Sequence, residues 1–111
     1  MARVLILLAT FDGAAYLDAQ METLAAQDHP AIDILASDDG STDGTRDILA
    51  HWQARWDKGR FDVIRGPGRG FAENFRQLLL SVEGDPDAVA FCDQDDLWAP
   101  DKLSAGLARL L

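Results

Sequence analysis

One stretch decides the fold of this chain: Ala88-Val-Ala-Phe-Cys-Asp-Gln-Asp-Asp-Leu-Trp-Ala-Pro100, in which five apolar residues lead directly into three carboxylates. An unbroken apolar run of this length predicts a strand that is buried on both faces. The three acids, Asp93, Asp95 and Asp96, then lie where that strand leaves the sheet. Three carboxylates within four residues repel one another, so they need solvent, cations or raised pKa values to coexist. A solvated acidic loop and a site for a hard divalent cation both fit this segment taken alone.

The rest of the chain alternates strand patterns with helix patterns. Strands are expected at residues 4–9, 32–37, 61–64 and 88–92, and helices at 14–27, after a capping segment at 41–43, after a glycine-rich loop at 66–70, and from Pro100 onward. Such alternation predicts right-handed crossovers and a mostly parallel sheet with helices on both faces. The expected fold class is therefore an α/β three-layer sandwich.

Polar residues follow each expected strand. In sheets of this kind, ligands bind outside the carboxyl ends of the strands. The groups found there are Thr10, Phe11 and Asp12; Asp38, Asp39 and Ser41; the loop 66–70 with Arg69; and Asp93, Asp95 and Asp96. We expect all of them on one rim of the sheet.

These residue types suit a nucleoside diphosphate bridged by a metal. The three acids after the last strand offer the oxygen ligands that Mg²⁺ or Mn²⁺ prefers. Arg69 lies on a loop whose glycines permit close approach, so it can reach a phosphate. Asp38 or Asp39 can accept hydrogen bonds from a nucleobase N–H or from ribose hydroxyls. The loop itself lacks the lysine of a Walker motif and the spacing of a dinucleotide fingerprint.

Simpler interpretations exist for several of these residues. Asp38 and Asp43 can serve only as helix caps, and Arg69 can be a solvated surface charge. Trp98 can pack beneath the acidic loop or line the pocket. His29 has no partner pattern and is expected to be a surface or helix residue.

Composition limits the partners and the location. The formal net charge of −9, from 10 basic and 19 acidic residues, argues against nucleic acid or an anionic membrane surface as the main partner. The apolar run 4–9 is too short for a membrane span and makes a poor signal peptide. We therefore expect a cytoplasmic protein, or in a larger parent a location at the inner membrane face. The single cysteine, Cys92, is expected to be a small buried hydrophobe.

Four motifs in order resemble the family 2 glycosyltransferases of the GT-A fold. They are Thr10-Phe-Asp-Gly13, Ser37-Asp-Asp-Gly-Ser-Thr-Asp-Gly-Thr45, Gly68-Arg-Gly-Phe-Ala-Glu-Asn-Phe75 and Phe91-Cys-Asp-Gln-Asp-Asp-Leu-Trp-Ala-Pro-Asp-Lys-Leu103. The Gln-Asp-Asp-Leu-Trp form is most similar to rhamnosyltransferase-like members that build bacterial surface polysaccharide. By this analogy the strand order is 3-2-1-4, and the activity is sugar transfer to a glycan or lipid-linked acceptor.

The resemblance also implies a site for a UDP-, GDP- or dTDP-linked sugar. It places the donor among Thr10, Phe11, Asp12, Asp38, Asp39, Arg69, Asp93 and Gln94, and the metal, Mg²⁺ or Mn²⁺, among Asp93, Asp95 and Asp96. Thr10, Phe11 and Asp39 would hold the nucleobase, and Arg69 would lie by the diphosphate. The Asp-x-Asp motif would hold ribose and metal. Phe11 stands where tyrosine is frequent in the family.

Family members normally continue well beyond the metal motif. Their later half binds the acceptor and supplies the carboxylate that acts as general base in inverting transfer. Residues 1–111 are thus expected to form one donor-binding domain, truncated after the metal motif and without the acceptor half. Strand 88–92 would then lie at an edge of the sheet, where it invites self-association.

Two other classes of function remain as alternatives. A non-catalytic nucleotide-binding fragment would keep the fold without the chemistry. A receiver-like phosphoacceptor domain would have similar length and architecture, but it needs an acidic pair after the first strand and a late strand-end lysine. In this chain the acidic pair follows the second strand, and Lys102 falls at a helix start.

We predict that the 111-residue chain transfers sugar poorly or not at all, although it binds the donor weakly. An acceptor hydroxyl needs a base to remove its proton, and the expected source of that base is the missing half. Incubation of the purified chain with labelled donor and a panel of acceptors tests this. Transfer to any acceptor would contradict it.

Overall fold

The computed structural model describes residues 2–93 and 95–110, in which four strands alternate with four helices. In chain order the elements are β1 (Val4–Thr10), α1 (Leu17–Ala25), β2 (Ile32–Asp38), α2 (Thr45–Arg55), β3 (Phe61–Arg65), α3 (Phe71–Leu80), β4 (Ala88–Cys92) and α4 (Lys102–Leu110). All strand pairs are parallel, and the sheet order is β3-β2-β1-β4. The expected α/β fold class and strand order are confirmed.

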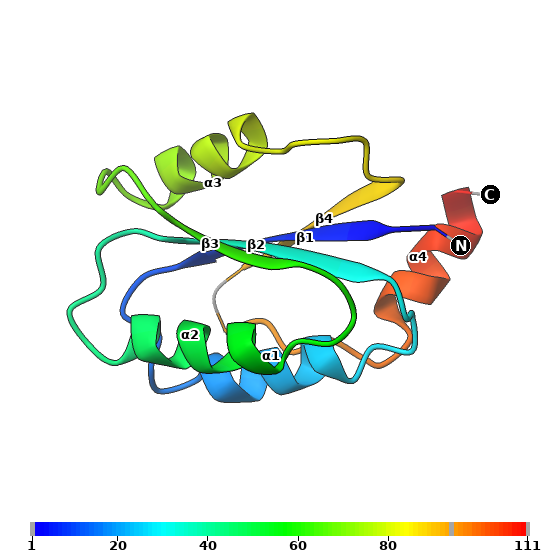
Figure 1. Cartoon of the computed structure of the whole chain (residues 1–111), viewed down its shortest axis with the longest axis horizontal. Coiled ribbons are helices and arrows are strands. Elements are labelled where there is room, and N and C mark those ends of the chain that lie inside the picture. The colour runs from blue at the N-terminus through cyan, green and yellow to red at the C-terminus, as the bar shows by residue number, and fades with distance from the viewer. Residues whose placement is uncertain (1, 94, 111) are drawn as a thin grey trace.

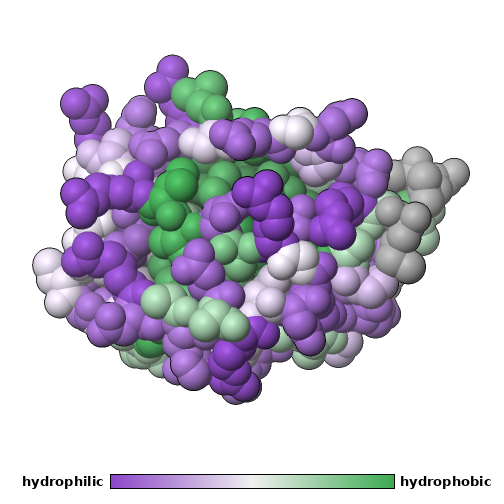
Figure 2. All heavy atoms as spheres, viewed as in Figure 1, coloured by the Kyte–Doolittle hydropathy of each residue, from purple (hydrophilic) through white to green (hydrophobic). Residues whose placement is uncertain are grey.

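The molecule has three layers. Helix α3 covers one face of the sheet, while α1 and α2 cover the other, and α4 lies at the end where β1 begins (Figure 1). In the same view the surface is mostly hydrophilic, and apolar atoms gather near its centre, between the helical layers (Figure 2).

Alternation along the central strand divides the core in two. Val4, Ile6 and Leu8 of β1 join the larger core cluster with α1 and α2, whereas Leu7 and Ala9 join the smaller cluster under α3. Successive side chains of a strand point to opposite faces, so one apolar strand contributes side chains to both core clusters. Each fully buried leucine or isoleucine stabilises the fold by roughly 1.5–3 kcal/mol.

Strand β4 departs from the expectation of burial on both faces. Ala88, Ala90 and Cys92 pack against the larger core cluster, but Val89 and Phe91 on the other face are 41% and 50% exposed. The reason is the position of α3, which lies over β1 and β2. The face of β4 on that side therefore stays open along much of its length.

Three local expectations need adjustment. The first helix begins at Leu17 rather than residue 14, because the Gly13 carbonyl accepts the N–H groups of both Tyr16 and Leu17 in a turn. The last helix begins at Lys102, two residues after Pro100. His29 is buried rather than exposed, with its ring Nε2 2.6 Å from the Ala2 carbonyl oxygen.

Among residues 2–93 and 95–110, no helix has both the length and the apolar character needed to cross a membrane.

Candidate functional site

The carboxyl ends of β1 and β2 meet at one rim of the sheet. Thr10 lies opposite Asp38 in the parallel register, and the Thr10 hydroxyl donates to Asp38 Oδ1 at 2.8 Å. Asp38 also accepts the Ser41 hydroxyl (2.6 Å) and the Ser41 N–H (3.0 Å). These neutral donors, with Arg46 Nε 4.0 Å away, explain how a carboxylate that is only 3% exposed is accommodated. Asp38 thus anchors the loop after β2, and its contact with a donor stays a prediction.

Asp39 holds the glycine-rich loop that follows β3. Its carboxylate accepts the N–H of Gly68 at 2.6 Å and the N–H of Gly70 at 3.0 Å. Both glycines have positive φ, 72° and 99°, a conformation that residues with a side chain rarely adopt. Asp39 therefore connects the rim of β2 to the loop on which Arg69 lies.

A buried pair attaches α3 to the same rim. The Ser37 hydroxyl donates to Asn74 Oδ1 at 2.6 Å, and Asn74 Nδ2 donates to the Ser37 carbonyl at 2.9 Å. Both side chains are buried, so each polar atom has its partner inside the fold. Sequence reasoning missed Asn74, although a polar residue within the apolar stripe of Phe71, Phe75 and Leu78 was a usable signal.

A hollow of about 310 Å³ opens between these groups. Its lining residues come from three strand ends and the start of α3: Ala9, Thr10, Phe11, Asp39, Gly68, Gly70, Phe71 and Asn74. Phe11 and Phe71 are 51% and 57% exposed, so aromatic surface is available beside a carboxylate. Three of the predicted donor residues, Thr10, Phe11 and Asp39, are thus brought together. Phe71 was not predicted, although it directly follows the glycine-rich loop.

A second hollow of about 440 Å³ adjoins the first through Phe71, which lines both. Its other lining residues are Ala72, Phe75, Arg76, Leu79, Phe91 and Asp93. Arg69 is exposed and lines neither hollow. A larger cavity of about 760 Å³ lies at the opposite end of the strands, among residues that include Arg3, Asp33 and Arg60. That cavity contains none of the predicted site residues.

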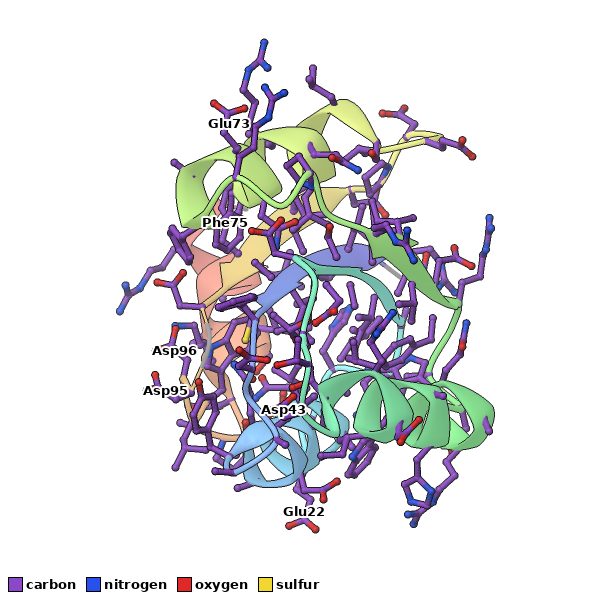
Figure 3. The ribbon with its side chains drawn as sticks, turned by 90° about the vertical axis from the view of Figure 1, so that its left-hand side faces the viewer. Glu22, Asp43, Glu73, Phe75, Asp95 and Asp96 are labelled. Carbon is purple, nitrogen blue, oxygen red and sulfur yellow. The ribbon has the colours of Figure 1, made fainter. Side chains whose placement is uncertain are left out.

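The acidic turn after β4 forms the outer part of the rim. Asp93, Asp95 and Asp96 are all exposed, and the Asp96 N–H closes the turn on the Asp93 carbonyl at 3.2 Å. Asp95 has a φ of 64°. Figure 3, which looks onto the rim, shows Asp95 and Asp96 at the same edge below Phe75. The predicted residue Gln94 lies outside the described residues.

The donor set of this turn fits a hard divalent cation, because carboxylate oxygens are the ligands that Mg²⁺ and Mn²⁺ prefer. However, among the residues that the structure describes, no group of three or more His, Cys, Asp or Glu side chains is arranged to hold a metal ion. The three carboxylates are exposed to solvent, and their oxygens do not converge on one point. Their role as metal ligands stays a prediction.

Hydrogen bonds join the loop after β1 to the loop after β2. Asp12, whose φ is 47°, accepts the Thr42 N–H at 2.8 Å, and its own N–H donates to Ser41 Oγ at 2.8 Å. Asp43 accepts the hydroxyl and N–H of Thr45 at the start of α2. The hydrogen bond from the Thr45 side chain lowers the pKa of Asp43. Asp43 thus holds the first residue of α2, but it is not the predicted helix cap, because Gly44 occupies the N-cap position and the helix has no side-chain cap hydrogen bond.

Cys92 and Trp98 belong to the core beneath the acidic turn. Both are buried and join the larger core cluster, so Trp98 packs under the turn, and it lines neither rim hollow. Burial raises the pKa of the Cys92 thiol to about 12, and the charges of Asp96 and Asp93 act in the same direction. The thiol therefore stays protonated at neutral pH, as a buried hydrophobe and not a nucleophile.

Comparison with known proteins identifies the family. Residues 5–111 match the family described as Glycosyl transferase family 2. The chain is 30% identical over 107 residues to the dTDP-rhamnosyl transferase RfbG of Shigella flexneri, an alignment that covers 94% of this chain and 37% of that protein.

Solved structures share the architecture. The mannosyltransferase PcManGT from Pyrobaculum calidifontis, in complex with GDP-Man and Mn²⁺, is similar with a TM-score of 0.82 and 25% identity, over 95% of this chain and 31% of that one. S. aureus TarS 1-349 in complex with UDP-GlcNAc gives a TM-score of 0.75 and 26% identity, over 96% and 30%. This chain therefore spans between 30% and 37% of the length of these relatives.

We predict that Gly66→Ala destabilises the protein by about 1–3 kcal/mol, because the new methyl group overpacks the rim. A Cβ at Gly66 would lie 2.6 Å from Oδ1 of both Asp39 and Asn74. Gly106→Ala in α4 is the matched control, since its Cβ meets no atom within 4 Å, and it should be neutral or stabilising by up to ~1 kcal/mol. Equal unfolding midpoints in urea for the two variants would contradict the close packing at Gly66.

Proposed function

The chain belongs to glycosyl transferase family 2, and we propose that it forms the donor-binding part of an enzyme that transfers a sugar from a nucleotide-diphosphate sugar. The observation that carries this proposal is the rim hollow, where Thr10, Phe11 and Asp39 meet the glycine-rich loop. The named ligands of two structural relatives, GDP-Man and UDP-GlcNAc, support the same class of donor.

The hollow suits a nucleobase in both shape and chemistry. Phe11 and Phe71 line the hollow and are each about half exposed, so their rings are available for a flat base to stack on. Asp39 lines the same hollow. Each of its oxygens accepts one glycine N–H, which leaves further lone-pair capacity for an N–H of the base. We propose that Asp39 performs both tasks, holding the loop and accepting from the base.

We propose that the diphosphate and its metal lie on the side of β4. Asp93 lies in the adjoining hollow with Arg76, so a carboxylate and a guanidinium are both available there. We propose that Asp93 and Asp95 hold Mg²⁺ or Mn²⁺, with Asp96 sharing the work, and that Arg69 approaches the phosphates. A cation bound there would neutralise the charge that develops on the leaving diphosphate. The relative PcManGT is named as a complex with Mn²⁺, which supports this choice of metal.

The wider reaction is proposed from the relatives. RfbG is named a dTDP-rhamnosyl transferase, and we propose sugar transfer to a glycan or lipid-linked acceptor in the synthesis of cell-surface polysaccharide. Acceptor binding and the general base are placed outside residues 1–111, in line with the greater length of the relatives.

We predict that one of UDP, GDP or dTDP raises the melting temperature of the chain, and does so more strongly with Mn²⁺. A ligand at one hundred times its Kd stabilises by about 2.7 kcal/mol. Asp93→Asn and Asp95→Asn should remove the effect of Mn²⁺, and Phe11→Ala should weaken the effect of the nucleotide itself. Asp62→Asn, on an exposed acid of β3, is the control that should change neither. If none of the nucleotides stabilises the chain, the proposed function is wrong.

We also predict self-association through β4. Its outer edge has no partner strand among the described residues, and Val89 and Phe91 are exposed beside it, a combination that favours pairing with a second chain. The net charge of −9 opposes association, so it should strengthen as salt screens the repulsion. Val89→Lys should abolish it, whereas Val63→Lys on the opposite edge strand β3 should not. A monomer at high concentration and high salt in light scattering would contradict this prediction.

A further inference from the structure

We propose that α1 positions the acidic turn by binding its backbone, which makes Gln20, Thr23 and Gln27 positioning residues for the metal ligands. This inference rests on the proposed function for the identity of those ligands. Its structural part, that three polar side chains determine the course of the described residues 93 and 95–103, rests on contacts alone.

The three residues are spaced to share one face. Gln20 and Thr23 lie in α1, and Gln27 lies two residues beyond the last residue of that helix. Residues three or four positions apart on a helix are neighbours on its surface. Gln20 and Gln27 are both buried, which is uncommon for glutamine. A buried polar row on a helix that otherwise buries Leu17, Met21 and Leu24 calls for partners inside the fold.

Each member of the row contacts the backbone of the segment after β4. Gln20 Nε2 donates to the Asp93 carbonyl, the Trp98 N–H donates to Thr23 Oγ1 at 3.1 Å, and Gln27 Nε2 donates to the Ala99 carbonyl at 2.7 Å. The Leu103 N–H donates to Gln27 Oε1 at 3.2 Å. The contacts run in the same order along both segments.

Thr23 is the central contact and its geometry is specific. Its hydroxyl hydrogen is used in a bond to the Gln20 carbonyl at 2.7 Å, so the oxygen is left as the acceptor for the Trp98 N–H. The Trp98 ring is itself buried in the core. The chain is therefore held at Asp93 and again at Trp98, and the exposed acids Asp95 and Asp96 lie on the short arch between these points.

Gln20 shows that this arrangement serves more than packing. Its Oε1 is buried and has no hydrogen-bond partner among the described residues, which is costly for a polar atom. An apolar side chain of similar size would avoid that cost, but it would leave the Asp93 carbonyl without the amide donor. Glutamine at position 20 is explained if its amide is needed to hold the Asp93 carbonyl in one direction. Partners that orient metal ligands from behind commonly change metal affinity by about 10–100-fold.

The test compares Thr23→Val, which keeps the shape but removes the acceptor, with Thr23→Ser, which keeps the acceptor. The first readout is Mn²⁺ binding in the presence of UDP, GDP or dTDP, followed by the electron paramagnetic resonance signal of free Mn²⁺. We expect Thr23→Val and Gln20→Met to weaken Mn²⁺ binding about tenfold or more, and Thr23→Ser to stay within about twofold of wild type. Gln53→Met is the matched control, because Gln53 of α2 donates to the Phe61 carbonyl at 2.8 Å, in another part of the fold.

The second readout is amide hydrogen exchange of residues 93–98 in the protein without metal or nucleotide. We expect exchange in this segment to be faster in Thr23→Val than in wild type, and unchanged in Gln53→Met. Unchanged exchange in Thr23→Val would overturn the positioning role. If Thr23→Val binds Mn²⁺ with wild-type affinity although its melting temperature is lower, then Gln20, Thr23 and Gln27 only stabilise the fold. That result would overturn the inference as well. Failure of the wild-type protein to bind Mn²⁺ with any of the three nucleotides would instead overturn the proposed metal site, and the exchange readout separates these cases.

Discussion

The parallel pairing of β1 with a strand on each side is the constraint on which the rest of the structure depends. Thr10 lies opposite Asp38 of β2, and Leu8 lies opposite Cys92 of β4. The strands therefore end at nearly the same level, and a parallel sheet sends all their carboxyl ends to one edge. The loops that follow them have to meet at that edge. Backbone pairing thus sets the position of the rim, whichever partners the rim side chains have.

The acids of the rim divide by environment into two groups. Asp38 and Asp39 are buried, and their carboxylates accept hydrogen bonds from the loops around them. Asp93, Asp95 and Asp96 are exposed, on a turn whose backbone is held from α1. Carboxylates of the first group give the loops their shape, because charge-assisted hydrogen bonds are strong in a buried setting. Carboxylates of the second group remain available to a ligand, while their backbone is constrained.

Helix α3 does not cover the whole of its side of the sheet, and much of β4 stays open there. Helix α3 contacts β1 and β2, and the ring of Phe75 meets that of Phe91 at a centroid distance of 5.4 Å. Beyond that contact, Val89 and Leu79 stay exposed. The donor hollow adjoins this open surface through Phe71. The open face of β4 therefore borders the proposed diphosphate side of the site, since Phe91 and Asp93 line the same hollow.

The sequence by itself determined the alternation of strands and helices, the parallel sheet, and which strand-end segments meet at the rim. Hydrophobic periodicity is a local pattern, and the topology of parallel sheets then places strand ends together. Only the tertiary structure decided which acids are buried and hydrogen-bonded and which are exposed, since Asp38 at the end of β2 and Asp93 directly after β4 stand at similar places in the sequence pattern. It also revealed Asn74, Gln20 and Thr23, whose partners lie 37, 73 and 75 residues away. Hydrogen bonds over such separations depend on how layers pack, so a local pattern can mark a polar residue in an apolar stripe but cannot identify its partner.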